Sequence, residues 1–338
     1  MLEKPDIADE RITACVGEQY EVQIDALTFL PLGADVNTAV YRAAAGDGST
    51  YFLKLRKGSF DELSAAVPQF LHALQIQPII VPLATRTPHP RDSRPWAEMD
   101  EYKLILYPFV EGKDGYEQAL TADQWRVFGK AMRGVHEAKL PPVLAERIGR
   151  EEFSARGRVL VRAFQKQAQG EHFVDAVAEK LAAFMRAHEA EITRLVERAD
   201  ALAGMLQERE LEFVLCHNDL HPGNILIAGD GRIFIVDWDS PLFAPKERDL
   251  CLIGGEGRGP WRSRSEAEAF YQGYGVTRID IPALAYYRCE RIIQDIAEFC
   301  SALLLTAEGG EDREQSYRYF VGQFQPGMDV EIALKTGE

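Results

Sequence analysis

The chain has 338 residues, enough for two compact lobes that each bury a core of their own. Its hydrophobic content of 46% and charged content of 27% are ordinary for a globular protein. The net charge of −15 argues against a nucleic-acid partner, which needs a basic surface, and is compatible with a small cationic substrate.

The sequence shows no sign of export, of a membrane segment or of a disulfide framework. It opens without the basic region and apolar core of a signal peptide, and its apolar runs are too short to span a membrane. The five cysteines are odd in number and scattered, so we expect reduced and mostly buried thiols. We therefore expect a cytoplasmic protein without an obligate protein partner.

Two strands, at 39–44 and 51–57, are predicted around the turn sequence Gly-Asp-Gly-Ser at 46–49. The preceding loop, 31–37, stands where a nucleotide-binding lobe would cover the triphosphate with backbone N–H groups. We expect Gly33 and Asp35 of this loop to contact the nucleotide. With a single glycine in the loop, an ordinary turn is the alternative.

Lys54 places a charge in the middle of an apolar strand, where it is costly unless it is paired. We expect it to bind nucleotide phosphates, and a lysine facing water at a strand edge is the alternative. The next helix is expected to begin at 59–62, where Glu62 either pairs with Lys54 or caps the helix by bonding back to Ser59. Pro68 predicts that this helix is kinked or broken after one or two turns.

The apolar run at 102–110 predicts a strong strand that ends at Pro108. A strand with a proline-stiffened connector suits a hinge whose backbone groups bind an adenine edge, so Tyr107, Pro108 and Phe109 are assigned to it. The boundary falls near Gly112. We expect an N-terminal nucleotide-binding lobe over 1–111 and a C-terminal catalytic and substrate-binding lobe over 112–338.

Helix dominates beyond this boundary. A capping box at Thr121 and Gln124 predicts a helix start, and His136 on the apolar face of that helix is expected to be a core histidine. Helical periodicity over 173–208 predicts one long helix or two. Asp249 is expected to cap a helix through the apolar segment 250–253 and to anchor the loop at 217–224 from behind.

The stretch 213–239 contains the residues that predict a reaction. An apolar run at 213–216 predicts a strand end, and Pro222 and Gly223 then force a loop. Segments 225–228 and 232–236 pair naturally across a Gly-Asp-Gly turn, and two aspartates, Asp237 and Asp239, follow.

Phosphoryl transfer needs such a set of carboxylates and a carboxamide. Asp219 and Asn224 have the spacing of the kinase catalytic loop, and Asp237 follows across a hairpin as the second metal ligand should. We expect Asp219 to act as the base, and Asn224 and Asp237 to bind Mg²⁺. A polar turn between core strands is the alternative.

Residues 286–295 are predicted to be helical. Glu290 and Asp295 are expected to reach a cationic substrate. The alternative is a surface pair between Arg291 and Asp295, which are four residues apart on the helix.

The segment CHNDLHPGNIL at 216–226 resembles the catalytic loop of the aminoglycoside phosphotransferases and of their relatives, the choline and fructosamine kinases. The chain is most similar to the spectinomycin phosphotransferase branch of this family. The similarity continues, in order, through residues 32–37, 54–63, 107–109, 237–250 and 286–297. It implies an α+β, bilobal protein-kinase-like fold with a small β-rich N-lobe and a larger, mainly helical C-lobe.

The resemblance also implies roles for individual residues. It maps Asp219 to the base, Asn224 and Asp237 to Mg²⁺ ligands, Lys54 to the phosphates, and residues 107–109 to the adenine hinge. Two features depart from kinases: the phosphate loop is poor in glycine, and Trp238-Asp239 stands where kinases have Phe-Gly. We therefore expect no protein-kinase-type switch there, and expect Trp238 or Asp239 to line the acceptor pocket.

The expected function is an ATP- and Mg²⁺-dependent O-phosphotransferase that acts on a cationic antibiotic, with spectinomycin as the leading acceptor. One alternative is a kinase for a small metabolite such as choline, homoserine or methylthioribose. Another is a kinase-like binding protein without activity. A third is a metallohydrolase with a metal at His217, Asp219 and His221.

Overall fold

The computed structural model describes residues 4–32, 37–58, 60–87, 93–306 and 310–337. Gly33 and Asp35 lie outside these residues. The chain packs as two compact units: the first comprises 1–120, 138–148 and 221–241, and the second comprises 121–137, 149–220 and 242–338. The predicted lobe boundary near Gly112 stays a prediction.

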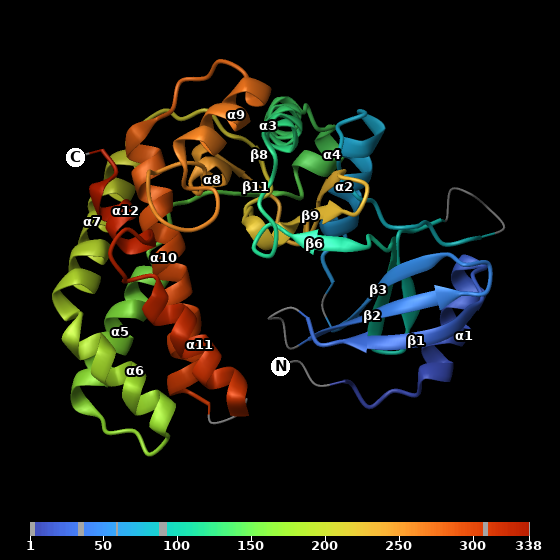
Figure 1. Cartoon of the computed structure of the whole chain (residues 1–338), viewed down its shortest axis with the longest axis horizontal. Helices are drawn as coiled ribbons and strands as arrows, with labels where there is room; N and C mark the ends of the chain where they lie inside the picture. Colours follow the sequence, from blue (N-terminus) through green and yellow to red (C-terminus); the bar gives the residue numbers. More distant parts are fainter. Residues whose placement is uncertain (1–3, 33–36, 59, 88–92, 307–309, 338) are drawn as a thin grey trace. The chain divides into compact units, whose positions relative to one another are not determined.

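The described elements of the first unit are shown in Figure 1. They are α1 (Asp9–Tyr20), β1 (Ile24–Leu30), β2 (Thr38–Ala45), β3 (Thr50–Lys57), α2 (Leu63–Ala73), β4 (Ala97–Met99), β5 (Tyr102–Pro108), β6 (Gly112–Asp114), α4 (Pro142–Ala145), the 3-10 turn η2 (Pro222–Asn224), β9 (Ile225–Ala228) and β10 (Ile233–Ile235).

Five strands of the first unit form an antiparallel sheet in the order β1-β2-β3-β5-β4. The predicted hairpin is confirmed, and Gly48 in its turn has a φ of 87°, which favours glycine. Helix α1 packs its apolar residues on the sheet against Leu53 and Leu55 of β3. Because side chains alternate along a strand, Lys54 and Arg56 point to the other face.

A smaller sheet, in the order β10-β9-β6, contains the second predicted hairpin. Ile233 pairs with Ile227 and Ile235 with Ile225, so the hairpin is confirmed with its expected strands. The turn closes through a hydrogen bond from the Gly231 N–H to the Ala228 carbonyl, and Gly231 has a φ of 85°.

Helix α2 differs from its prediction. It begins at Leu63 and continues to Ala73 with Pro68 inside it, so the proline does not break it. Pro68 removes one backbone hydrogen bond, but it is buried together with Val67 and Leu71, and this packing keeps the segment helical. The predicted capping residue Ser59 lies outside the described residues.

The described elements of the second unit follow in chain order. They are α3 (Ala122–Glu137), β7 (Gly149–Arg150), α5 (Arg156–Gly170), α6 (Ala176–Ala187), α7 (Glu189–Gln207), β8 (Val214–Cys216), β11 (Leu242–Ala244), α8 (Glu247–Leu250), α9 (Arg264–Tyr274), α10 (Ile281–Leu304), α11 (Gly310–Gly322) and α12 (Asp329–Lys335).

Several helix predictions for this unit are confirmed. Thr121 and Gln124 bond reciprocally as a capping box at the start of α3, and the region 173–208 forms two helices, α6 and α7. The helix predicted over 250–253 is wrong. Helix α8 ends at Leu250, and the left-handed φ of Gly254 and Gly255 turns the chain soon afterwards.

All five cysteines are unpaired and buried, as predicted. Burial raises the pKa of each thiol above its ordinary value. Among the described residues, no helix combines the length and apolar character that crossing a bilayer requires.

Helices α3 and α9 approach each other closely at two glycines. A Cβ atom at Gly129 of α3 would collide with the Phe270 carbonyl oxygen of α9. One at Gly273 of α9 would collide with the Arg126 carbonyl oxygen of α3. The absence of a side chain at these positions therefore lets the two backbones touch.

Gly129→Ala should lower the free energy of unfolding by roughly 2–3 kcal/mol, because the added methyl group forces the helices apart. Gly204→Ala in α7 is the control, since a Cβ atom there meets nothing within 4 Å. It should raise stability by about 0.5–1 kcal/mol. Urea unfolding measures both values, and a neutral Gly129→Ala would contradict the close approach.

Candidate active site

Lys54 is the centre of a charged cluster in the first unit. Its Nζ donates hydrogen bonds to Asp237 Oδ1 at 3.2 Å and to Asp239 Oδ2 at 2.5 Å, and its side chain is only 12% exposed. Burial alone would lower the pKa of this ammonium, but the charges of Asp237 and Asp239 outweigh it and raise the pKa. The predicted phosphate lysine is thus adjacent to the predicted metal aspartate.

Two further residues belong to this cluster. Arg56 Nη1 lies 3.1 Å from Asp239 Oδ2, so one carboxylate joins two cations of β3. Burial, with a contribution from the charges of Asp239 and Asp237, raises the pKa of the hinge residue Tyr107. Tyr107 also pairs with Phe52 in the sheet register, two residues before Lys54, so part of the predicted hinge lies close to the predicted phosphate lysine.

The remaining hinge residues stand at the end of the β3–β5 pairing. Pro108 pairs with Tyr51 in the sheet register, and the Phe109 N–H donates to the Thr50 carbonyl at 3.0 Å. The guanidinium of Arg42 lies 5.1 Å from the centre of the Phe109 ring. Both residues are thus fixed to the sheet.

Asn224 and Asp237 stand at the same end of the β9–β10 hairpin. The Val236 N–H donates to the Asn224 carbonyl at 3.0 Å, which places the residue before Asp237 beside Asn224. Asp237 has a φ of 62°, a conformation that aspartate tolerates better than most residues, and its side chain is 46% exposed. A carboxamide and an accessible carboxylate are oxygen donors that fit a hard cation such as Mg²⁺.

Glu62 does not fill the partner role that was considered for it. Its carboxylate pairs with Arg147 at 3.2 Å, and both side chains are 46% exposed. The ion-pair partners of Lys54 are instead Asp237 and Asp239. Glu62 precedes the first residue of α2 and stands at an exposed helix end, which explains the difference.

Asp219 belongs to the second unit, where it pairs with helix α10. Arg291 Nη1 donates to Asp219 Oδ1 at 2.6 Å, and Arg291 Nε lies 3.3 Å from Asp295 Oδ1. The predicted pair between Arg291 and Asp295 is confirmed. Burial raises the pKa of Asp295 to about 6, although the charge of Arg291 opposes this shift.

Asp249 holds the backbone of the loop that precedes Asp219. Its carboxylate accepts hydrogen bonds from the N–H groups of His217 at 2.8 Å and Asn218 at 2.9 Å. The same carboxylate meets His136 Nε2 at 3.1 Å, while His136 Nδ1 meets the Tyr274 hydroxyl at 2.7 Å. The anchoring role of Asp249 and the core position of His136 are both confirmed.

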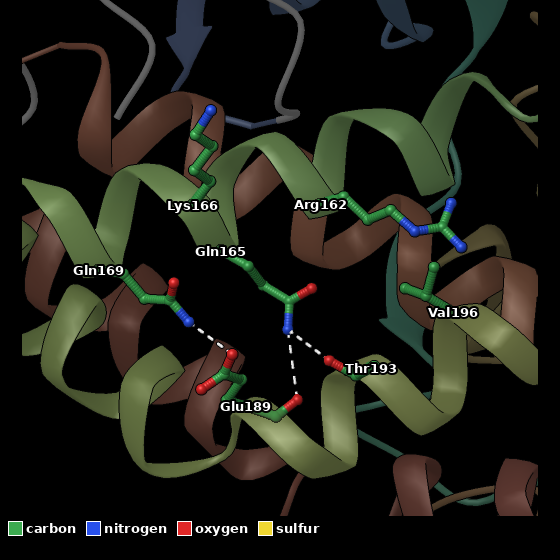
Figure 2. A pocket seen from close by; sticks show the side chains of 7 residues that line it. All are labelled: Arg162, Gln165, Lys166, Gln169, Glu189, Thr193 and Val196. Atoms are coloured by element: carbon green, nitrogen blue, oxygen red, sulfur yellow. Dashed lines mark hydrogen bonds between the residues drawn. The ribbon is translucent and has the colours of Figure 1, made fainter.

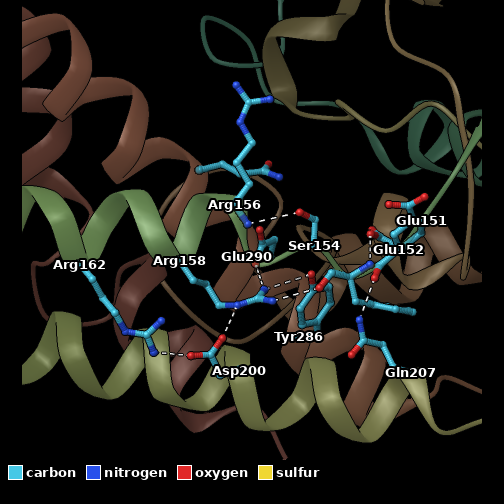
Figure 3. Close-up of polar contacts among 12 residues, drawn as sticks. Glu151, Glu152, Ser154, Arg156, Arg158, Arg162, Asp200, Gln207, Tyr286 and Glu290 are labelled. Atoms are coloured by element: carbon cyan, nitrogen blue, oxygen red, sulfur yellow. Dashed lines mark hydrogen bonds and ion pairs between the residues drawn. The ribbon is translucent and has the colours of Figure 1, made fainter.

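Glu290 is buried in an ion-pair network rather than exposed (Figure 3). Its Oε2 accepts from Arg158 Nη1 at 2.8 Å, and Arg158 also bonds to Asp200 and to the hydroxyl of Tyr286. Helices α5, α7 and α10 each contribute a charge to this network. Such a position favours a structural role for Glu290 over the predicted contact with substrate.

The contact of Trp238 with an acceptor stays a prediction, and Trp238 itself is buried.

Sequence reasoning missed Arg56 and the pairing of Arg291 with Asp219. A signal for Arg56 existed, since it follows Lys54 by two residues in the same strand and so faces the same side. No local signal links Arg291 to Asp219, which are 72 positions apart.

Within the described residues, three side chains that could ligate a metal lie close together. His136, Cys216 and Asp249 have ligand atoms within 4.8 Å of one another, and all three are buried. The group includes none of the residues considered for a metallohydrolase. Its Asp249 and His136 already hold the loop and Tyr274, which indicates a structural cluster.

A pocket of about 260 Å³ lies between α5 and α7 (Figure 2). Gln165 spans it by donating to the Glu189 carbonyl at 3.3 Å and to Thr193 Oγ1 at 3.1 Å. None of the predicted site residues lines this pocket.

Asp249→Asn should lower the free energy of unfolding by roughly 2–4 kcal/mol at pH 7, because buried N–H groups lose a charged acceptor. Burial alone would raise the pKa of Asp249, but hydrogen bonding and charge from His136 make the folded pKa lower than usual. The ionised form therefore stabilises the fold above about pH 4, and this contribution is lost as pH falls through the folded pKa.

Urea unfolding at pH 7 and pH 3 measures this difference, with Glu268→Gln on the exposed surface of α9 as the control. Amide hydrogen exchange at His217 and Asn218 should also become faster in Asp249→Asn. A destabilisation of equal size at both pH values would contradict the role of the ionised carboxylate.

Comparisons with known proteins agree with this geometry. A model of the phosphotransferase enzyme family, APH, matches residues 28–287. An 82-residue segment, 23% of this chain, is 33% identical to an aminoglycoside 3′-phosphotransferase of Streptomyces fradiae and spans 31% of that protein.

Solved structures extend the similarity to nearly the whole chain. Spectinomycin phosphotransferase APH(9)-Ia, in complex with ADP and spectinomycin, is 34% identical, with a TM-score of 0.91 over 98% of this chain and 99% of that one. Its AMP-bound complex is 33% identical, with a TM-score of 0.86 over 97% and 99%. Macrolide 2′-phosphotransferase MphH from Brachybacterium faecium, 18% identical with a TM-score of 0.54 over 92% and 97%, shares the fold.

These similarities confirm the predicted α+β, protein-kinase-like fold class and an enzyme that transfers phosphoryl groups. Because the family match covers more than half of the sequence, the chain belongs to the phosphotransferase enzyme family.

Proposed function

We propose that this protein transfers the γ-phosphoryl group of ATP to a hydroxyl of a cationic antibiotic, with spectinomycin as the leading acceptor. The observation that carries the proposal is the similarity, at 34% identity over 98% of the chain, to a phosphotransferase solved with ADP and spectinomycin. The family match over 28–287 also includes Lys54, Asp219 and Asp237.

The first unit supplies the residues proposed for the nucleotide. Lys54 binds the phosphates, and the hinge at 107–109 binds the adenine edge, with Gly33 and Asp35 in the covering loop. Asn224 and Asp237 would hold Mg²⁺, which would supply positive charge to the phosphates when bound. The pairing of Lys54 with Asp237 supports this assignment, because it joins a phosphate-binding cation to a metal-binding carboxylate.

The second unit supplies the base. Asp219 accepts the proton of the acceptor hydroxyl as the oxygen attacks phosphorus. The ion pair with Arg291 holds the Asp219 carboxylate in one orientation, so the hydroxyl meets a group that is already aligned. Catalysis of phosphoryl transfer depends largely on positioning, and a base held in one orientation contributes to it.

The charge around Asp219 supports a cationic acceptor. Asp295 lies on the next turn of α10 beyond Arg291, and Glu298 follows it one turn later. Burial and the charge of Asp219 raise the pKa of Glu298, while Arg291 opposes the shift. We propose that Asp295 contacts an ammonium group of the acceptor, and that Trp238 helps to line the acceptor site.

Asp219→Asn should reduce kcat by roughly 10²- to 10⁴-fold, the usual loss when a general base is removed, and leave ATP affinity within about twofold. Asp123→Asn, on the exposed start of α3, is the control. The measurement is an ATP-dependent mass shift of the acceptor, followed over time.

The same assay tests the acceptor. Incubation with spectinomycin and several aminoglycosides should give a mass increase of one phosphate on spectinomycin. Choline, homoserine and methylthioribose test the metabolite kinases that were considered from the sequence. If only one of these metabolites is phosphorylated, the acceptor is a metabolite and not an antibiotic. An Asp219→Asn variant with full activity would contradict the assignment of Asp219 as the base.

A further inference from the structure

Lys54 has two carboxylate partners, and they are not equivalent. Asp239 Oδ2 lies 2.5 Å from Lys54 Nζ, whereas Asp237 Oδ1 lies 3.2 Å away. The side chain of Asp239 is 31% exposed and that of Asp237 is 46% exposed. The closer and more covered partner is therefore the aspartate that has no proposed metal role.

Asp239 is itself held by a second cation. Arg56 Nη1 lies 3.1 Å from the same oxygen, Oδ2, that accepts from Lys54. Arg56 follows Lys54 by two residues in β3, so both cations project from one face of the same strand. Because one oxygen of Asp239 contacts both cations, Arg56 limits the movement of Asp239 and, through it, that of Lys54.

Protein kinases meet the same need differently, because their phosphate lysine pairs with a glutamate from a helix. The sequence predicts Glu62 for that place, but its carboxylate pairs with Arg147 instead. A lysine in a strand that binds phosphates still requires a partner, since its long side chain otherwise samples many rotamers. Asp239 has the distance and the burial to be that partner.

We propose that Asp239 is the positioning residue for Lys54, and that Arg56 holds Asp239 in place. Given the proposed function, on which this role rests, Asp237 is left to Mg²⁺ and Lys54 stays paired with Asp239 when nucleotide binds. The lysine is then positioned by the segment that also contains the metal aspartate. Its position does not depend on helix α2, and Asp239 has no part in lining the acceptor site.

The test is a double-mutant cycle, because a residue that acts through Lys54 must lose its effect when Lys54 is absent. Asp239→Asn should lower kcat/KM for ATP by about tenfold or more, a change of 1.4 kcal/mol per factor of ten. In a Lys54→Met background the same substitution should change kcat/KM by less than about twofold. Glu98→Gln, in an exposed ion pair of the same sheet, is the matched control.

Arg56→Gln gives an independent arm if Asp239→Asn folds poorly, as judged by its thermal melt. It should lower kcat/KM in the same direction by a smaller factor, since the pair of Lys54 and Asp239 remains. Arg56→Lys should restore most of the loss. Affinity for a fluorescent ATP analogue, measured in EDTA without acceptor, should follow the same cycle, because it reports on the lysine without the metal.

Four results would overturn the inference. Equal effects of Asp239→Asn in both backgrounds would show that it acts independently of Lys54. Rescue by high Mg²⁺ would make Asp239 a metal ligand. If Glu62→Gln lowers kcat/KM only when Lys54 is present, and Asp239→Asn has no effect, then Glu62 is the positioning residue for Lys54. Failure of the unaltered protein to bind ATP would overturn the proposed function as well.

Discussion

The residues that the second unit contributes to the site depend on the hydrogen bonds that the carboxylate of Asp249 accepts. It is fully buried, and it accepts from two successive backbone N–H groups and from His136. A buried anion is tolerated only when its oxygens are satisfied in this way. The chain then takes a left-handed conformation at Asn218, with a φ of 76°, immediately before Asp219. Backbone hydrogen bonds on one side and Arg291 on the other thus restrain the proposed base.

The first unit reaches a comparable restraint by strand register. The pairing of β9 with β10 places Asn224 beside Val236, so the carboxamide and the carboxylate of Asp237 stand at one hairpin end. Lys54 is fixed by its register in β3, between Val40 and Ile105. Its contact with Asp237 then joins two segments that are 183 positions apart. Hydrogen-bonded ladders determine where these charges lie, and the charges in turn connect the two sheets.

The features that sequence reasoning predicted are those with local causes. A glycine turn predicts the hairpin around Gly231, a capping box predicts the start of α3, and apolar spacing predicts a core position for His136. Partners that are distant in sequence could not be read this way. The packing of three helices brings Arg158 to Glu290. The packing of two sheets brings Lys54 to Asp239. Pro68 misled for a related reason, because burial kept its helix intact.

The buried cysteines have a practical consequence for attaching a spectroscopic probe to either unit. A thiol reacts with maleimide dyes as its thiolate, and all five native thiols are covered and have raised pKa values. The native background is therefore slow to label, and it needs no cysteine-free variant. One new cysteine at the exposed Val174 and another at the exposed Glu117 would place a dye on each unit. Each dye would then report on the surroundings of its own unit when nucleotide or acceptor is added.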